Sequence, residues 1–262
     1  SEDLRKTISI SLNEILELHG YHIIYKPKCQ DDSESENPFE NAVEFFKELI
    51  VSESLRDYFK AYDRKKFLDE KNDPITNPKK LKEIFENYRP PSILIDLIQR
   101  LPAEYRILDQ NGKFQEKPKS YTESTMKFID GQWLEFYVFK TLKKKFNVCM
   151  DLEIRKESWN KDLKFQLDLI ITKGYQLVGI SCTTSSEKAL CKSKGFEVFL
   201  RITQIGGQEA RAVLITTMDE EKRRQVEEEL QIDTGGRENI IVLGINDLKP
   251  EILTKKIEDF IE

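Results

Sequence analysis

Two patterns of apolar residues divide the chain. In the first half, Phe39, Val43 and Phe46 fall on one helical face, and Asn-Pro pairs at 37–38 and 77–78 are typical signals for a helix start. In the second half, short apolar or alternating stretches typical of strands separate longer stretches with helical spacing. The pattern therefore predicts a mainly helical part followed by an α/β part.

The α/β part is expected to follow a defined order. It opens with a broad apolar stripe at helical spacing over residues 125–145, which we expect to pack on a sheet. The order of helix, three strands, helix and strand is that of a restriction-endonuclease-like mixed sheet flanked by helices, here with one extra strand and helix. The elements after the first helix are strands 148–155, 165–172 and 175–183, helix 185–203, strand 210–216, helix 219–230, strand 239–245 and helix 250–261.

Three parts follow from these patterns. Residues 1–36 are expected to form a short strand and a helical turn ending at Gly20, followed by a mobile loop over 30–36. Residues 37–120 are expected to form a helical connector with a hairpin turn at Asn111-Gly112, and residues 121–262 the α/β domain. A winged-helix module is the alternative for the connector; a plain helical connector is favoured because no helix gathers Arg and Lys on one face.

Composition narrows the class of protein. The 262 residues carry 34% charged side chains and a formal net charge of −5, with no apolar run near eighteen residues, so a soluble protein without a membrane span is expected. The negative charge argues against coating nucleic acid through bulk charge, although a local basic cleft remains open. Two histidines argue against histidine-based triads and zinc sites. Four scattered cysteines are expected to be unpaired thiols in a reducing cytoplasm.

Candidate chemistry lies at the ends of two neighbouring strands. Asp168 interrupts an otherwise apolar strand, and Ser181 and Thr183 share one face of the next strand, reached through the tight Lys173-Gly174 turn. If the hairpin brings these faces into register, they share one pocket with Glu135, which projects from the preceding helix. Two carboxylates and a backbone carbonyl are the hard oxygen ligands that Mg²⁺ prefers.

Each of these residues also has an ordinary structural interpretation. Asp168 could form a salt bridge at a strand end, although an unpaired carboxylate inside an apolar strand is costly. Glu135 could be helix surface, and Ser181 and Thr183 could be simple strand formers. Cys182, on the opposite face, is expected to pack in the core.

The same residues carry a family resemblance. Asp-Gly-Gln-Trp-Leu-Glu at 130–135, Gln-Leu-Asp at 166–168, Ile-Ser-Cys-Thr-Thr at 180–184 and Ile-Gly-Gly at 205–207 resemble the C-terminal half of the CRISPR ancillary nucleases. Those proteins couple a CARF sensor for cyclic oligoadenylate to a PD-(D/E)xK nuclease. The resemblance implies a divalent ion, Mg²⁺ or Mn²⁺, and a sensor domain that is not part of this chain.

The motif departs from the family at two positions. Glu135 and Asp168 match metal-site positions, whereas Ser181 stands where the family has a metal-binding Glu and Thr183 where it has the catalytic Lys. We therefore expect Ser181 to be a weak metal ligand and Thr183 a pocket hydroxyl. Lys188, or Lys192, on the next helix is the candidate for the missing base.

The sequence thus favours a metal-dependent endonuclease acting on DNA or RNA, the effector of a cyclic-oligoadenylate-regulated CRISPR-type defence protein. The alternative is an inactive pseudonuclease that serves nucleic-acid binding, dimerisation or signal transmission. A cytoplasmic homodimer is expected, because the stripe containing Trp133, Phe136 and Phe139 is wider than one sheet face needs.

Overall fold

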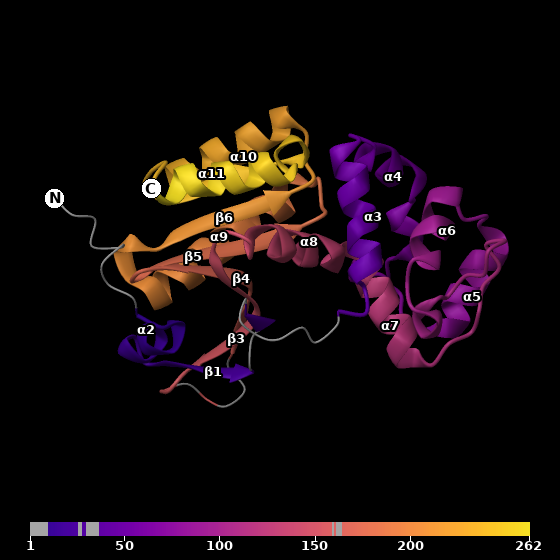
Figure 1. The fold of residues 1–262 in the computed structure, drawn as a ribbon, viewed down its shortest axis with the longest axis horizontal. Helices are drawn as coiled ribbons and strands as arrows, with labels where there is room; N and C mark the ends of the chain where they lie inside the picture. The colour runs from indigo at the N-terminus through magenta and orange to yellow at the C-terminus, as the bar shows by residue number, and fades with distance from the viewer. Residues whose placement is uncertain (1–9, 26–27, 30–36, 159, 161–163) are drawn as a thin grey trace. The chain divides into compact units, whose positions relative to one another are not determined.

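The computed structural model describes residues 10–25, 28–29, 37–158, 160 and 164–262. Its contacts divide the chain into two units. The α/β unit comprises Ser1–Ser33 and Val138–Glu262, and the helical unit comprises Glu34–Tyr137 (Figure 1). The loop predicted at 30–36 lies outside the described residues, as does most of the strand predicted before the first helix.

The α/β unit is built on a mixed sheet with the strand order β1-β3-β4-β5-β6-β7, in which β2 pairs with β3. Neighbouring strands from β1 to β5 are antiparallel, and β6 and β7 continue the sheet in parallel with β5. The strands are β1 (Tyr21–Tyr25), β2 (Lys28–Cys29), β3 (Asn147–Lys156), β4 (Phe165–Lys173), β5 (Gln176–Thr183), β6 (Arg211–Thr216) and β7 (Ile240–Leu243).

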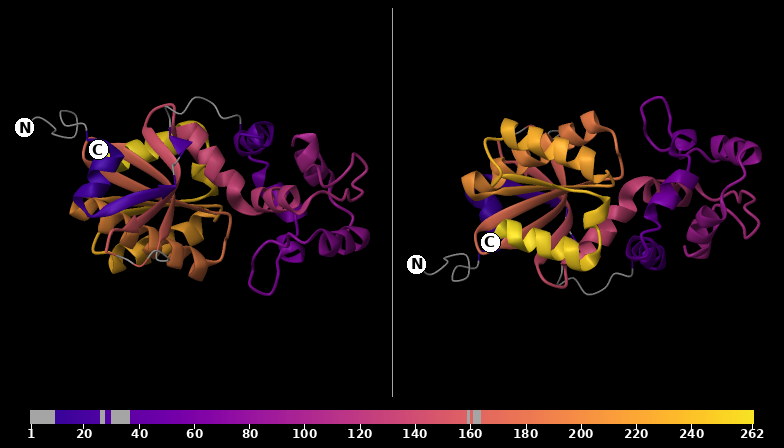
Figure 2. Two further views of the ribbon diagram at one scale, coloured as in Figure 1. Left: turned by 90° about the horizontal axis from the view of Figure 1, so that it is seen from below. Right: turned by 90° about the horizontal axis from the view of Figure 1, so that it is seen from above.

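Helices cover both faces of this sheet. Figure 2 shows α9 and α10 on one face and α11 on the other. Gly179 of β5 lets α9 approach closely, because a Cβ at this position would lie 3.0 Å from Cβ of Ile202. The helices of the unit are α2 (Leu12–Leu18), α9 (Lys188–Gly206), α10 (Glu220–Asp233) and α11 (Pro250–Ile261), with short 3₁₀ turns η4 (Gly207–Glu209) and η5 (Ile245–Asp247).

The predicted order of strands and helices after residue 146 is confirmed, with boundaries shifted by a few residues. Gly174, with φ of 63°, forms the predicted tight turn between β4 and β5, and Gly207, with φ of 67°, follows α9. Within the described ranges, no helix has the length and apolarity needed to cross a membrane.

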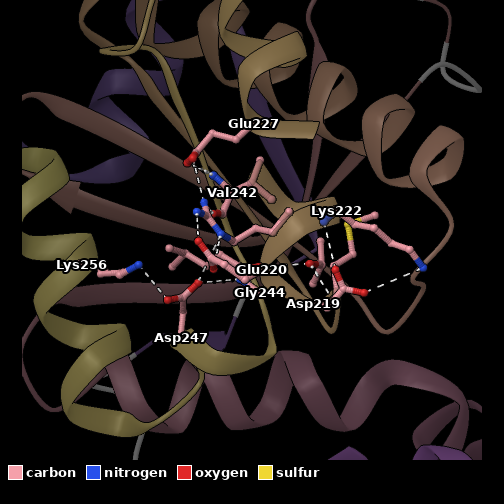
Figure 3. A network of polar contacts seen from close by, with 12 residues as sticks. Asp219, Glu220, Lys222, Glu227, Val242, Gly244, Asp247 and Lys256 are labelled. Carbon is pink, nitrogen blue, oxygen red and sulfur yellow. Dashed lines mark hydrogen bonds and ion pairs between the residues drawn. The ribbon is translucent and has the colours of Figure 1, made fainter. Parts of the chain in front are cut away.

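A buried arginine joins α10 to β7 and η5. The guanidinium of Arg223 donates to Glu227 Oε2 at 2.7 Å, to the backbone carbonyl of Val242 at 2.9 Å and to both carboxylate oxygens of Glu220 (Figure 3). Glu220 first, and then Glu227, raise the pKa of Arg223 above its usual range although burial lowers it. Asp247, only 4% exposed, lies 4.0 Å from the same guanidinium.

The carboxylate of Asp247 closes this network. It accepts from the backbone N–H of Gly244 at 2.8 Å and pairs with Lys256 of α11 at 2.7 Å. Figure 3 shows these contacts meeting between α10, the end of β7 and α11. The network therefore joins helices from the two faces of the sheet at its parallel end.

The helical unit has an aromatic core. Phe46 stacks on Trp133 with ring centroids 4.0 Å apart, and Phe39 stacks on Phe128 at 4.5 Å. The bidentate ion pair of Arg64 with Asp130 adds a partly buried link. The unit contains α3 (Glu40–Val51), α4 (Leu55–Ala61), η1 (Arg64–Phe67), α5 (Pro78–Asn87), α6 (Ser92–Gln99), η2 (Ala103–Tyr105), α7 (Lys119–Lys127) and the π-helical turn η3 (Phe128–Gln132).

One turn occurs twice in this unit, forty residues apart. Asp69 and Asp109 each accept two backbone N–H groups through Oδ1, two and four residues later. Each turn also has one antiparallel bridge, Leu68 to Pro74 and Leu108 to Phe114, and a left-handed residue, Asn72 or Gly112. A short 3₁₀ helix precedes each turn, and a helix next to a proline follows it. The hairpin turn predicted at Asn111-Gly112 is thus confirmed as the second of two structural copies.

The helix predicted over 125–145 is confirmed through residue 142, with a π-helical turn within it. It is α7, then the π-helical turn η3, then α8 (Trp133–Leu142), which contains the boundary between the units. Trp133 and Phe136 contact aromatic rings inside the helical unit, so the expectation that the whole stripe packs on the sheet is wrong. Because these rings are buried, the stripe no longer supports a homodimer, which stays a prediction.

The cysteine prediction is also wrong in part. Cys29 and Cys149 lie opposite each other on β2 and β3 and form a disulfide with a Cα–Cα distance of 4.1 Å. Cys182 and Cys191 are buried and are not disulfide-bonded, and burial raises the pKa of the Cys191 thiol to about 11. The sequence reasoning missed the pair because no short spacing links two cysteines 120 residues apart.

We predict that Arg223→Met costs about 3 kcal/mol of unfolding free energy, because it leaves the Glu227 and Asp247 carboxylates without their shared cation. Urea unfolding followed by far-UV circular dichroism measures the change. Arg224→Met, at the exposed neighbouring position, should stay within about 0.5 kcal/mol of the parent. Equal effects of the two substitutions would show that the network does not stabilise the fold.

Candidate active site

The register of β3, β4 and β5 places three polar residues in a row. Leu169 lies opposite Ile180 on β5 and opposite Met150 on β3. One step further along β4, the same register puts Asp168 between Ser181 and Asp151. The carboxylate of Asp168 therefore lies at the centre of the row.

Asp168 is bound directly to the end of β5. Its Oδ2 accepts from Ser181 Oγ at 3.0 Å and from the backbone N–H of Cys182 at 2.8 Å. The expected shared register of the two strands is present. The Ser181 hydroxyl therefore acts as a hydrogen-bond donor to the aspartate.

Asp151 was not singled out from the sequence. It is half-buried, and its φ of 57° is left-handed, a conformation that costs a non-glycine residue on the order of 1 kcal/mol. Met150 and Leu152 pair regularly with β4, whereas Asp151 between them is not part of this regular pairing. The sequence signal that could have identified Asp151 is the one used for Asp168, namely an acidic residue inside an apolar strand. The left-handed backbone of Asp151 could not be predicted from the sequence.

The electrostatic environment of Asp151 is mixed. Burial raises the pKa of its carboxyl group, the charge of Lys28 opposes this rise, and the charge of Asp168 adds to it. Gln166 Nε2 lies 3.4 Å from Asp151 Oδ1. The carboxylates of Asp151 and Asp168 are thus brought together where β3 and β4 pair, and the charge of Asp168 contributes to the raised pKa of Asp151.

The other candidate residues are placed differently. Thr183, 9% exposed, accepts from the backbone N–H of Ser185 at 3.2 Å through Oγ1. Lys188 pairs with Glu229 of α10 at 2.5 Å, and Lys192 pairs with the same carboxylate at 3.0 Å. Both lysines therefore link α9 to α10, and the assignment of Lys188 as a base stays a prediction.

Glu135 belongs to α8 within the helical unit, whereas Asp168 belongs to the α/β unit. The role of Glu135 as a metal ligand stays a prediction. Among the described residues, the carboxylates brought together at the site are those of Asp151 and Asp168.

The donor set suits a magnesium or manganese ion only in part. No group of three or more His, Cys, Asp or Glu side chains that could hold a metal occurs in the described part of the chain. Mg²⁺, however, is commonly held by one or two carboxylates together with substrate phosphates and water. Asp151 and Asp168 supply such a pair, so the site fits an ion whose coordination is completed by substrate, and fits a tightly held resident ion poorly.

The mixed sheet and its flanking helices define a restriction-endonuclease-like fold. Residues 122–238 match the protein family described as "Card1-like, endonuclease domain". The match covers α8, β3, β4, β5 and α9, and therefore includes the row of Asp151, Asp168 and Ser181. No curated protein matches the chain.

Two solved structures share the fold. Protein VC1899 from Vibrio cholerae has 17% sequence identity and a TM-score of 0.58, and the match covers 96% of this chain and 62% of that one. Can2 from Sulfobacillus thermosulfidooxidans, solved in complex with cyclic tetra-adenylate, has 12% identity and a TM-score of 0.59, covering 97% of this chain and 62% of that one. This chain therefore spans less than two thirds of the length of either protein.

We predict that Asp151→Asn stabilises the ion-free protein at pH 7. The raised pKa of Asp151 means that the fold favours the protonated carboxyl, so its contribution to stability is lost as pH rises through that pKa. Asparagine stays neutral and tolerates a left-handed backbone. The gain should shrink on acidification and vanish below the ordinary aspartate value of 3.8, as measured by urea unfolding across pH in EDTA.

Asp259→Asn, at an exposed position of α11, serves as the control and should change stability little at any pH. If Asp151→Asn destabilises the ion-free protein at neutral pH, the carboxylate is favourably paired and does not repel Asp168.

Proposed function

We propose that the α/β unit is an endonuclease that uses Mg²⁺ or Mn²⁺ to cleave DNA or RNA. The observation that carries the proposal is the carboxylate pair of Asp151 and Asp168, located within the segment that matches an endonuclease-domain family. In this arrangement the second carboxylate comes from β3, whereas the family pattern takes it from position 181 of β5.

The residues of the row have different roles in this proposal. Asp168 and Asp151 would hold the ion, which when bound supplies charge stabilisation for the phosphodiester under attack and acidifies its water. Ser181 and the backbone N–H of Cys182 fix the orientation of the Asp168 carboxylate. Because Ser181 donates a hydrogen bond where the family has a carboxylate, the ion is bound weakly until substrate phosphate joins it.

The wider role is proposed from the resemblance of the motifs. We infer that the chain is the effector part of a CRISPR-type defence protein regulated by cyclic oligoadenylate, with the CARF sensor lying outside it. The fold shared with Can2, which was solved with cyclic tetra-adenylate, supports this role. A cytoplasmic homodimer that brings two sites to one nucleic acid accords with it.

A specific observation favours a second candidate, a pseudonuclease that binds nucleic acid without cutting it. One oxygen of Asp168 is already satisfied by Ser181 and Cys182, and Thr183 Oγ1 accepts from the Ser185 backbone. A site whose polar groups are satisfied internally gains less from an ion than an open set of carboxylates does.

We predict that Asp168→Asn and Asp151→Asn each reduce cleavage at least about 100-fold, because each removes half of the negative charge that would hold the ion. The assay follows labelled single-stranded and duplex DNA and RNA with Mg²⁺ or Mn²⁺, with an EDTA control. Asp259→Asn should cleave like the parent. Cleavage that survives both site substitutions would exclude this pair as the ion site.

Restoring the family motif distinguishes the two candidate functions, an active endonuclease and a pseudonuclease. Ser181→Glu combined with Thr183→Lys adds a carboxylate beside Asp168 and an ammonium group on the same strand face. If the parent protein is inactive and the double variant cleaves in a divalent-ion-dependent way, the natural chain is a pseudonuclease. A folded double variant that neither binds Mn²⁺ better nor cuts shows that these positions are not those of the nuclease motif.

A further inference from the structure

The two copies of the turn in the helical unit carry different charges on a similar backbone. Residues 64–82, around the first turn, contain seven Lys and Arg against three Asp and Glu, in a chain whose net charge is −5. Residues 104–122, forty positions later, contain four against three. Both copies have the aspartate that accepts two backbone N–H groups and the antiparallel bridge. The extra positive charge of the first copy is therefore not a requirement of the turn.

Three lysines of the first copy are not neutralised. Lys71, at the tip of the turn, and Lys79 and Lys80, at the start of α5, are exposed. Their ammonium groups form no hydrogen bond or ion pair with any residue that the structure describes. By contrast, Lys127 at the end of α7 pairs with Glu123 one helical turn earlier, at 2.7 Å. The charges of the first three lysines are thus available to a partner from outside the chain.

The fold brings these lysines together although no single helix has a basic face. Asn77 Oδ1 accepts from the backbone N–H groups of Lys79 and Lys80, which fixes the start of α5 directly after the turn. Backbone N–H groups are the main cause of the lowered pKa of Asp69, and the charges of Lys71 and Lys80 lower it further. Two lysines nine positions apart in the sequence therefore lie near one carboxylate of the turn.

Folding of α5 does not explain its lysines. The first turn of this helix has Lys79 and Lys80 and no acidic residue, whereas the helix dipole favours negative charge at this end. The second copy forms the same turn with neutral residues: Asn111 stands at the position of Lys71, and Ser120 at that of Lys80. The positive charge of the first copy is therefore better explained by an anionic partner.

We propose that Lys71, Lys79 and Lys80 form a surface of the helical unit that contacts the phosphates of a nucleic acid. This inference rests on the proposed action of the α/β unit on nucleic acid and adds a part of the chain that holds it. Ammonium groups on flexible side chains bind phosphates as point charges and do not read bases, so the contact is independent of sequence. Because the chain as a whole is negative, attraction to a polyanion requires a local basic surface of this kind.

The first experiment gives the first copy the residues of the second. Fluorescence anisotropy in EDTA follows labelled DNA and RNA oligonucleotides binding to the parent and to the double variant Lys71→Asn with Lys80→Ser, across a salt series. The double variant should bind about tenfold more weakly, and its salt slope should fall by about two phosphate contacts. Lys71→Arg with Lys80→Arg keeps both charges and should retain the affinity and the slope.

The matched control removes two lysines of the same unit that carboxylates already neutralise. Lys60 pairs with Asp57, and Lys127 pairs with Glu123. Lys60→Gln combined with Lys127→Gln changes the net charge by the same amount and should leave affinity and slope close to those of the parent. Far-UV circular dichroism checks that every variant is folded. If the parent binds no oligonucleotide, or if the two double variants weaken binding equally, the proposed surface is excluded.

A cleavage assay with Mg²⁺ or Mn²⁺ separates this inference from the proposed nuclease. If the parent cleaves and Lys71→Asn with Lys80→Ser binds as tightly as the parent, the surface is excluded while the nuclease assignment stands. If no ion supports cleavage but the exchange weakens binding as expected, the surface is a phosphate contact of a pseudonuclease.

A competition experiment tests the alternative that the surface binds an acidic protein. Unlabelled oligonucleotide and polyglutamate of equal total charge compete for the parent against the labelled oligonucleotide. Nucleic acid should displace the label at a concentration at least about tenfold lower than polyglutamate, because closely spaced phosphates release condensed counterions on binding. Equal displacement would show that the surface recognises acidic chains in general, and would overturn its assignment to nucleic acid.

Discussion

The register of three antiparallel strands determines the chemistry of this molecule. Because β3, β4 and β5 are aligned without a net shift, Asp151, Asp168 and Ser181 lie across from one another. A slip of one residue on β4 would turn Asp168 to the opposite face and place an apolar side chain in the row. The Gly174 turn and the close packing of Gly179 under α9 both constrain that alignment.

Much of this alignment could be predicted from the sequence. The tight turn at Lys173-Gly174 fixes which residues of the hairpin face each other, and alternation then puts Asp168 and Ser181 on one side. The place of Asp151 in the site could not be predicted, because it depends on a left-handed backbone conformation. An aspartate within a strand sequence does not indicate such a conformation. The π-helical turn at residues 128–132 within the long helix also depends on tertiary packing, since Phe128 stacks on a ring from a distant segment.

The disulfide could not be predicted for a different reason. Its partners come together only because a two-residue strand adds to the edge of β3, and such a strand has almost no periodic signal. The bond also closes a loop of 120 residues that contains the whole helical unit. Restricting so long a loop removes a large part of the conformational freedom of the unfolded chain, so the bond stabilises the fold as well as the local site.

The duplicated turn of the helical unit contains a comparison within one chain. Its two copies differ at nearly every exposed position. Asn111 stands where the first copy has Lys71, and Lys113 stands where it has Asp73, which reverses the sign of the charge. What they share is the aspartate that receives two backbone N–H groups and a residue that tolerates a left-handed conformation. The shared geometry of the two turns therefore follows from the requirements of the backbone, and their exposed side chains can differ in charge without changing it.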